Sequence, residues 1–572
     1  MTEPYHLREA LVCACIAVLC ASCIYLQLNA THTSLFFASQ LSLVVLELVI
    51  IQIFYRLSLH PLAKYPGPLL AACTDWYTVY WIASGERHLE LHRQHKKYGK
   101  YVRYGPSRLS INSALASKDL HSVNSNTFKS NAYSSFKRFF GAEMSLTTSD
   151  HKIHAFRRRV NAKALSRVTI TNFEPKVKPH VDILVNKIAQ SCLGKEHPWS
   201  SAQNMAHLIA YCVADIMGDI TFSQHWNVQL DEKNRHFVHD LPKGVAGIHL
   251  VGHMQSLFRF NLHSIIFSQL IQGVTQLMTL SRNFADNRAK EPEGNDIWAS
   301  LLASRDPKTG KGFSHDELVS EASLFIIGGT DGMITAITAT LFYLVHNPHT
   351  LDRLTNAIRK SFSVSSLSHN DGSEGLECPI RFASQEVQDI AYLVACIDEA
   401  MRLSPPVPSI LPRVVGPGGI FIDGEYFPAG VDLGIPHYSL HRDPEYFPQP
   451  LLYNPERWLQ EEEVARALSD VQRTSILPGT VQALPFTPFG AGRSSCIGKQ
   501  VAYHEMSYIL ARLLWQFDIR LDPNNGHIGE GTGTGVEGRE RKDEFQLSCR
   551  FVSQQEGPVL QFKMRDDGRA VH

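Results

Sequence analysis

The feature that most constrains this chain is a stretch rich in glycine and proline near its C-terminus, P-F-T-P-F-G-A-G-R-S-S-C-I-G, from Pro485 to Gly498. A helical pattern begins directly afterwards, near Lys499, so the backbone must turn tightly and present the sulfur of Cys496 at a helix start. The partial positive charge at a helix N-terminus favours a thiolate. No paired cysteine or adjacent base marks Cys496 as a nucleophile, and the glycines with Phe489 favour a large flat ligand. A buried structural cysteine is the alternative.

A thiolate on such a loop is suited to bind haem iron as an axial ligand. The segment Phe489–Gly498 resembles the haem-binding signature of the cytochrome P-450 superfamily in its Phe, second Gly, Cys and final Gly. The resemblance implies that Cys496 is the metal ligand and that Phe489 lies against the haem. The family's basic residue two before the cysteine is Ser494 here, so the propionate contact from this loop falls to Arg493.

Composition excludes some classes of partner. The 572 residues carry 55 basic and 55 acidic side chains, so nothing in the net charge suggests nucleic-acid binding, and a small apolar partner is favoured. Of 11 cysteines, several lie within an N-terminal apolar run and the rest lack zinc-type spacing, which predicts a reducing compartment for the folded domain.

Two apolar runs at the N-terminus, Ala10–Leu28 and Leu35–Tyr55, predict a membrane anchor with one or two transmembrane helices. A cleaved signal peptide is the alternative for the first run, but its removal would leave the second in place. Arg56 and Lys64 follow the second run whereas Arg8 alone precedes the first, which places the following domain on the cytoplasmic side.

The predicted organisation is an anchor over residues 1–58, a proline-rich hinge over 59–70 and a catalytic domain over 71–572. The prolines of the hinge predict an extended conformation, and the segment resembles the connector of fungal microsomal members of the superfamily. The resemblance implies the endoplasmic reticulum membrane as the location. A sequon at Asn29 abuts the apolar runs and is expected to carry no glycan.

A short sheet and a basic helix are expected next. A strand and turn are predicted over 98–106 with a returning strand at 109–111, and a helix with a dense basic face over His151–Ser166. In the family's register, His154 and Arg158 on this helix reach a haem propionate. Three other basic residues of the helix are candidates for a surface that meets an electron donor, namely Arg157, Arg159 and Lys163.

A long helix is predicted from the capping box of Ser314 and Glu317 to Asn347. Its middle, G-G-T-D-G, is unfavourable for a helix because each interior glycine costs about 1 kcal/mol relative to alanine. Gly328 and Gly332 lie four residues apart on one face, so a flat cofactor or substrate can approach the backbone there.

This glycine-rich turn resembles the oxygen-binding groove of the superfamily, with Asp331 as its acid. The family's two threonine positions are Gly332 and Met333 here, so the usual hydroxyl is missing. Three sources remain for the catalytic proton: Asp331 through ordered water, Thr335 after a local helix distortion, or a hydroxyl of the substrate. Substrate or water is favoured because the glycine leaves room for either.

Two further segments resemble family elements. Glu399 and Arg402, three apart on a helix, together with Arg457, are expected to form a buried charged triad with a structural role. Arg413 matches the strand arginine that meets a propionate. By contrast, the apolar and aromatic segment 245–270 is equally suited to the core, a membrane contact or a substrate lid, and the glycine-rich segment 526–538 is expected to be a flexible insertion between two strands.

These signals occur in the family's order. By this resemblance the chain is identified as a member of the superfamily, with a mainly α-helical fold and small β-sheets. The implied function is oxidation of an apolar small molecule, expected to be a fungal secondary-metabolite intermediate, with dioxygen, haem and electrons from a membrane-bound NADPH-cytochrome reductase. Two alternatives stay open: a haem-thiolate enzyme that rearranges or dehydrates its substrate, and a non-catalytic haem-binding protein. A membrane scaffold without haem is a further alternative.

Overall fold

The molecule is described by a computed structural model that covers residues 33–193, 197–254, 268–291, 294–307, 309–362, 378–459, 485–533 and 535–565. The first apolar run, Ala10–Leu28, and the sequon at Asn29 lie outside these residues. The helices are α2 (Thr33–Phe54), α3 (Leu69–Cys73), α4 (Trp76–Ser84), α5 (Arg87–Tyr98), α6 (Ala114–His121), α7 (Ser134–Phe140), α8 (His151–Ala164), α9 (Arg167–Asn172), α10 (Glu174–Cys192), α11 (Met205–Phe222), α12 (His236–His253), α15 (Ser268–Ala289), α16 (Ile297–Ala303), α17 (His315–His346), α18 (Pro348–Ser361), α19 (Gln385–Gln388), α20 (Ala391–Leu403), α21 (His437–Leu440) and α23 (Lys499–Gln516).

The strands are short and form small sheets, as predicted. They are β1 (Tyr101–Gly105), β2 (Arg108–Ile111), β3 (Thr127–Lys129), β4 (Gln203–Asn204), β5 (Arg413–Val415), β6 (Ile420–Ile422), β7 (Glu425–Phe427), β8 (Asp432–Gly434), β9 (Phe517–Leu521), β10 (Ser548–Arg550), β11 (Val552–Gln554) and β12 (Val559–Met564). The largest sheet has the order β1-β2-β8-β5-β3, and β10 pairs with β11 as a hairpin. The mainly α-helical fold with small sheets is therefore confirmed.

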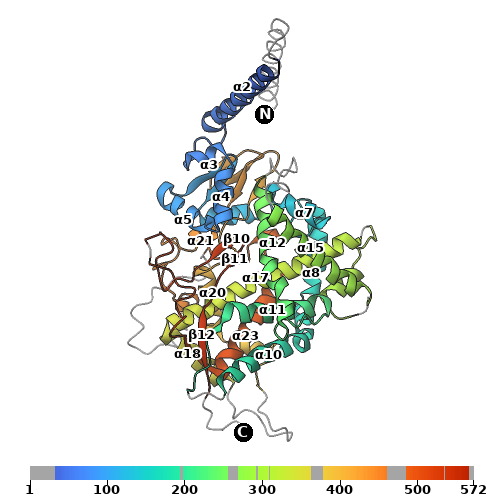
Figure 1. Ribbon diagram of the computed structural model, residues 1–572, viewed down its shortest axis with the longest axis vertical. Coiled ribbons are helices and arrows are strands. Elements are labelled where there is room, and N and C mark those ends of the chain that lie inside the picture. The colour runs from blue at the N-terminus through green and yellow to red at the C-terminus, as the bar shows by residue number, and fades with distance from the viewer. Residues whose placement is uncertain are drawn as a thin grey trace.

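Helix α17 is the central element of the helical body (Figure 1). Its capping box forms as predicted: the Glu317 N–H donates to Ser314 Oγ at 3.3 Å, and the Ser314 N–H donates to Glu317 Oε2 at 2.9 Å. Its 32 residues correspond to a length of about 48 Å at 1.5 Å per residue. Helices α11, α20 and α23 pack against it, so most of α17 is buried.

Helix α2 projects from the body at the N-terminal end (Figure 1). Residues 39–59 have a mean hydropathy of 1.9 and none of the most apolar window is buried, whereas 83% and 67% of the corresponding windows of α11 and α17 are buried. Exposure thus separates the three long apolar helices: α11 and α17 belong to the core, and the second predicted apolar run is the candidate membrane anchor.

The connector after α2 departs from the extended hinge that its prolines predict. The Ala63 N–H donates to the His60 carbonyl oxygen at 2.7 Å and the Tyr65 N–H to the Leu62 carbonyl oxygen at 3.1 Å, so this part turns. Leu62 is fully buried against the largest sheet, in a cluster with Leu109 of β2. The Tyr65 ring stacks on Phe427 with centroids 5.8 Å apart. Burial of these apolar side chains favours the turned form. The connector is therefore part of the folded body.

Candidate functional site

Cys496 stands at the end of the glycine loop that precedes α23. The backbone is left-handed at Gly490 (φ +66°) and Gly492 (φ +62°), and the Cys496 N–H donates to the Phe489 carbonyl oxygen at 2.7 Å. A Cβ atom at Gly492 would overlap the carbonyl oxygen of His121, so only glycine fits there. The loop closes on itself and leaves the Cys496 side chain exposed to a ligand.

Two opposing influences act on the Cys496 thiol. Burial among the surrounding atoms raises its pKa, although part of the side chain is accessible, whereas the N–H groups of Gly498 and Lys499 and the charge of Arg158 lower it. The pKa is raised overall, so the helix start alone does not produce the thiolate that the sequence predicts. A metal cation bound to the sulfur would supply the missing stabilisation of the deprotonated form.

One stripe of α17 is open while the rest of the helix is buried. Phe325, Gly328, Gly329 and Gly332 are exposed or half-buried, at the spacing of a single helical face. A Cβ at Gly328 would meet nothing within 4 Å, and one at Gly332 would meet only Pro406 Cβ, at 3.8 Å. Because the glycines keep this face bare, a flat molecule can lie on the backbone, and α17 packs against the α23 that follows Cys496.

The three residues predicted around the oxygen-binding groove separate in the structure. Asp331 is buried, and burial raises the pKa of its carboxyl to about 7. The Thr335 hydroxyl, fully buried, lies 2.9 Å from the Asp331 carbonyl oxygen, 3.2 Å from that of Ser553 and 3.0 Å from Gln555 Oε1. Thr335 is thus held against β11, whereas Gly332 remains on the open stripe.

Basic side chains gather where strands β3 and β5 of the largest sheet lie near α8. Lys129 of β3 lies directly opposite Arg413 of β5, and both lie close to Arg158 and His154 of α8; we call these four residues the cation cluster. Burial, with Arg413 and Arg158, lowers the pKa of Lys129 well below its usual value, and burial with the same cations lowers that of His154 to about 4. Within the described ranges, no carboxylate lies within ion-pair distance of Lys129 or Arg413. Such a cluster fits a ligand with two negative charges.

Arg158 and Arg493 hold the cysteine loop in addition to lying near this cluster. Arg158 donates to the Ser495 carbonyl oxygen at 2.7 Å and to Ser495 Oγ at 2.9 Å. Arg493 donates to the Ser125 carbonyl oxygen at 2.7 Å, and its Nη1 lies 3.2 Å from His151 Nδ1. The residues predicted to contact the propionates therefore fall into two groups. His154 and Arg413 have no ion-pair partner within the described residues, whereas Arg158 and Arg493 are already hydrogen-bonded to the protein.

Sequence reasoning missed Lys129. Its position depends on pairing between β3 and β5, two strands far apart in the chain, and T-F-K carries no local mark of that pairing. Arg157 was misplaced in the predicted donor surface: it is buried, with Nη2 2.6 Å from Glu317 Oε1 and Nη1 3.1 Å from Glu321 Oε1. Arg159 and Lys163 are exposed and remain candidates for that surface.

Glu399, Arg402 and Arg457 meet in the structure. Glu399 Oε1 lies 2.8 Å from Arg402 Nη2 and 3.0 Å from Arg457 Nε, and Trp458 Nε1 donates to Glu399 Oε2 at 2.9 Å. Arg402 also donates to the carbonyl oxygen of His441 at 2.8 Å. The Glu399 and Arg402 side chains are fully buried, so removal of either would leave an unpaired charge in the core.

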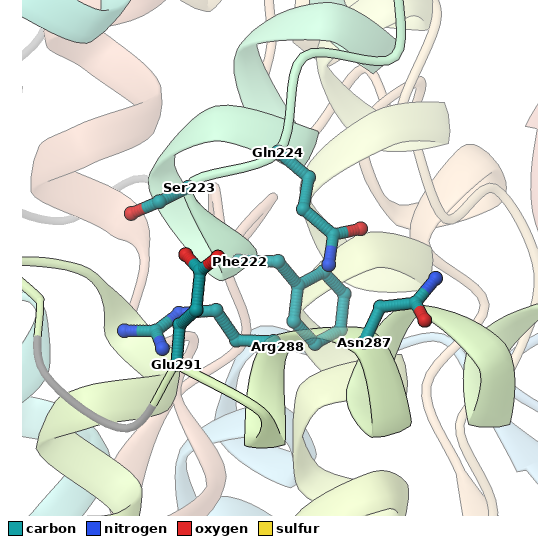
Figure 2. A pocket seen from close by; sticks show the side chains of 6 residues that line it. All are labelled: Phe222, Ser223, Gln224, Asn287, Arg288 and Glu291. Atoms are coloured by element: carbon teal, nitrogen blue, oxygen red, sulfur yellow. The ribbon is translucent and has the colours of Figure 1, made fainter.

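A pocket of about 310 Å³ lies between the ends of α11 and α15 (Figure 2). Figure 2 shows the side chains of Arg288 and Glu291 on one side of it and Gln224 on the other. Arg288 Nε is 2.7 Å from Asp296 Oδ2 in a buried ion pair. None of the lining residues belongs to the cysteine loop, the open stripe or the cation cluster, so this pocket is separate from the candidate site. Of the segment 245–270, His249 and His253 are buried, and residues 255–267 lie outside the description.

The glycine stripe, the accessible sulfur and the cation cluster together fit haem, whose flat ring, iron and two propionates need these three surroundings. Comparison with known proteins agrees. The cytochrome P-450 family model matches residues 70–532. Similar curated proteins include the cytochrome P-450 monooxygenase fscF of Fusarium equiseti, 32% identical over 90% of this chain and 94% of that protein.

Two further relatives come from other fungi. The cytochrome P-450 monooxygenase atnE of Emericella nidulans is 30% identical over 92% of this chain and 97% of its own length. Averantin hydroxylase of Dothistroma septosporum is 29% identical over 82% of this chain and 83% of its own length. Since the family model covers most of the chain and these relatives are aligned along nearly all of it, the protein is a haem-dependent oxidoreductase that belongs to the cytochrome P-450 family.

Proposed function

We propose that this protein is a membrane-anchored monooxygenase that places one atom of dioxygen into an apolar small molecule of fungal secondary metabolism, with Cys496 as the axial ligand of its haem. The observation that carries the proposal is the accessible Cys496 sulfur at the end of a glycine loop, with N–H groups of Gly498 and Lys499 directed toward it. The haem, when bound, supplies the oxidising chemistry, which thiolate ligation favours.

The chain's own residues would divide the remaining work. Lys129, His154 and Arg413 would hold the propionates, because no carboxylate of the described part of the chain lies within ion-pair distance of them. Arg158 and Arg493 would hold the cysteine loop through Ser495 and Ser125. Phe489 would pack near the ring: its own ring is 5.3 Å from that of Tyr503 on α23.

A proton must reach the groove without the usual threonine. Asp331 carries a raised pKa of about 7, so near pH 7 its carboxyl exists in both the protonated and the ionised form and is suited to transfer a proton. Gly332 leaves room beside it for water or for a hydroxyl of the substrate. Thr335 is a poor donor, because its hydroxyl is already engaged with Asp331 and β11.

The membrane proposal rests on the surface that follows α2. Large apolar side chains are exposed on the helices that come next, Leu69 and Leu70 of α3 at 68% and 66%, and Trp76 and Tyr80 of α4 at 51% and 64%. They would rest on the bilayer that α2 enters. We propose the endoplasmic reticulum membrane, with the body on the cytoplasmic side and electrons from an NADPH-cytochrome reductase that meets Arg159 and Lys163.

The test is turnover under labelled dioxygen, with the purified full-length protein, a reductase and NADPH. The compound that accumulates when the gene is deleted serves as substrate. One labelled oxygen atom in the product supports a monooxygenase. A product without label, formed at the same rate without NADPH, would assign the protein to the rearranging or dehydrating haem-thiolate enzymes, which the missing threonine at Gly332 keeps open. Haem binding without any product would favour a non-catalytic haem protein.

A further inference from the structure

Arg87, the first residue of α5, is buried without a hydrogen-bond acceptor or an ion-pair partner in the described part of the chain. It is 2% exposed, and its Nε, Nη1 and Nη2 atoms are all buried without a hydrogen-bond acceptor. In the described part of the chain, no other arginine has all three nitrogen atoms in this condition. Burial of a guanidinium without hydrogen bonds is costly, so this side chain requires an acceptor that the protein itself does not provide.

Other hydrogen-bonding atoms around Arg87 are also unused. Its guanidinium carbon lies 5.4 Å from the centre of the Tyr104 ring, a cation–π distance. Tyr104 Oη, Arg108 Nη1 and His249 Nδ1 are buried and have no partner, and Arg108 and His249 are close enough to Arg87 to interact with it electrostatically. These groups come from α5, β1, β2 and α12, so several elements place buried, unused polar atoms near Arg87.

The acidic side chains of this region lie beside Arg108 and not beside Arg87. Arg108 is compensated: its Nε is 3.5 Å from Asp75 Oδ1 and 3.8 Å from Asp432 Oδ2. No acid lies within ion-pair distance of Arg87 in the described ranges. A singly charged group with two acceptor oxygens matches the unpaired charge of Arg87 and the forked donors of its guanidinium. A carboxylate has that charge and that shape.

A hairpin connects this region to the oxygen-binding groove. The Cys549 N–H of β10 donates to the Gly85 carbonyl oxygen at 2.7 Å, and Cys549 pairs in register with Ser553 of β11. The Ser553 N–H donates to the Pro406 carbonyl oxygen at 2.8 Å, and Pro406 is the residue nearest the open face of Gly332. The path from Gly85 through Cys549 and Ser553 to Pro406 crosses three neighbouring backbone segments. At about 4.8 Å for each step, Gly85, next to the start of α5, lies roughly 15 Å from the groove.

Aromatic rings pack around the tip of this hairpin. Phe551, at the tip of the hairpin, has its ring centre 5.7 Å from that of Phe136 and 5.1 Å from that of His249. A ligand that reaches from Arg87 to Gly332 must therefore be elongated and largely apolar. We propose that Arg87, with Tyr104 and His249, binds a carboxylate at one end of an elongated apolar substrate whose other end is oxidised beside Gly332. This inference rests on the proposed function, since it concerns the substrate of the same site.

The experiment uses the full-length haem protein in detergent, titrated with myristic acid and with methyl myristate while the spin-state change of the haem is recorded. The two probes share the same hydrocarbon chain, and the ester replaces the negative charge with a neutral methyl ester group. We expect wild type to bind the acid at least about tenfold more tightly than the ester, the usual effect of a charge-assisted hydrogen bond. Arg87→Gln should abolish this preference without weakening ester binding. The matched control is Arg93→Gln on the same helix, whose side chain pairs with Glu90, and it should keep the preference.

The outcomes separate the two levels of inference. The carbon monoxide difference spectrum and the haem content report on the proposed function, and the acid-to-ester ratio reports on Arg87. Equal affinity for both probes in wild type, or an unchanged ratio in Arg87→Gln, overturns the carboxylate site and leaves the monooxygenase assignment intact. Tighter binding of dodecyl phosphate than of myristic acid also overturns it. If Arg87→Gln does not fold, Arg87→Lys replaces it: loss of the forked donors should lower the ratio, and an unchanged ratio refutes the proposal.

Discussion

Lys129 and Arg413 lie directly opposite each other in the antiparallel pair of β3 and β5, with no carboxylate within ion-pair distance of either in the described residues. Like charges that face each other across a strand pair are destabilising. A fold that retains them must gain from the arrangement elsewhere, and a ligand with two negative charges supplies that gain. The pair therefore has opposite effects in the apoprotein and in the haem-bound protein.

Lys129→Gln should separate these effects. Haem should dissociate several-fold faster, because one cation proposed to hold the propionates is lost, while the apoprotein should melt at a higher temperature, because the repulsion with Arg413 is relieved. Haem transfer to apomyoglobin measures the first effect and thermal melting of the apoprotein the second. Lys137→Gln, at an exposed site paired with Glu143, is the control that should change neither. Unchanged haem loss in Lys129→Gln would refute the role of this residue.

Cys496→Ser should abolish the carbon monoxide difference band typical of thiolate ligation, because the hydroxyl cannot replace the thiolate on iron. Haem content should fall as well, yet the spectrum of the remaining haem is the decisive readout. Cys73→Ser changes a half-buried free cysteine outside the loop and should leave the band intact. Persistence of the band in the Cys496 variant would exclude this sulfur as the ligand.

Glu505 of α23 makes stability depend on pH. It is 2% exposed, its Oε1 has no partner, and burial raises its pKa to about 8. In the unfolded chain the carboxyl loses its proton near its ordinary value of 4.5, so the unfolded state binds fewer protons than the folded state between about 4.5 and 8. Stability must then fall as pH rises through this window and level off above it.

Glu505→Gln removes that dependence. The free energy of unfolding of the variant relative to wild type should rise between pH 5 and pH 8, by a few kcal/mol at most, since one pKa unit corresponds to about 1.4 kcal/mol. The difference in melting temperature should rise in parallel. Scanning calorimetry of the haem-bound protein over this range is the measurement. Glu540→Gln, at an exposed site, should show no such trend. A gain that is constant with pH would assign the effect to packing rather than to ionisation.

The sequence predicted the elements that depend on local patterns. The capping box at Ser314 marked the start of α17, and the glycine loop before Lys499 marked the start of α23, because caps and tight turns are encoded within a few neighbouring residues. The open stripe of α17 followed from the spacing of Gly328 and Gly332 alone. Such features need no knowledge of distant segments.

What the sequence did not predict depends on distant contacts. Lys129 acquires its setting from β5, and Arg157 is removed from the surface by Glu321, a residue of another helix. In the glycine-rich segment 526–538, predicted to be flexible, the described N–H groups of Gly531 and Thr532 donate to the carbonyl oxygens of Arg541 and Arg539, and a Cβ at Gly538 would overlap Leu89 of α5. No local pattern reports which surface a loop will cover.

Truncation tests the turned connector. Removal of residues 1–58 should leave a haem-binding body that needs less detergent, because none of the most apolar window of residues 39–59 is packed against that body. Removal of residues 1–64 should also delete Leu62, which is fully buried against the largest sheet, and lower the melting temperature by several degrees. Within the longer chain, Leu62→Ala should reproduce much of that loss. Equal melting of the two truncated proteins would show that the connector contributes nothing to the fold.

Gly332→Thr tests the source of the proton. The structure tolerates the substitution sterically, because a Cβ there would meet only Pro406, at an ordinary contact distance of 3.8 Å. The side chain would instead occupy the space that water or a substrate hydroxyl is proposed to use. We expect lower turnover with the native compound, with more reducing equivalents lost as peroxide, measured as product formed per NADPH consumed. Gly332→Ala, which adds bulk without a hydroxyl, separates crowding from hydrogen bonding.

Companion variants distinguish the remaining donors. Asp331→Asn removes the carboxyl with the raised pKa and should slow turnover and raise the solvent isotope effect, because proton delivery becomes limiting. Thr335→Val removes a hydroxyl engaged with β11 and should lower stability while it leaves the isotope effect unchanged. If Gly332→Thr instead raises the product formed per NADPH, the groove lacks only a hydroxyl that it is able to use. The proposal that substrate or water delivers the proton at Gly332 would then be wrong, and the groove would simply lack a proton donor at this position.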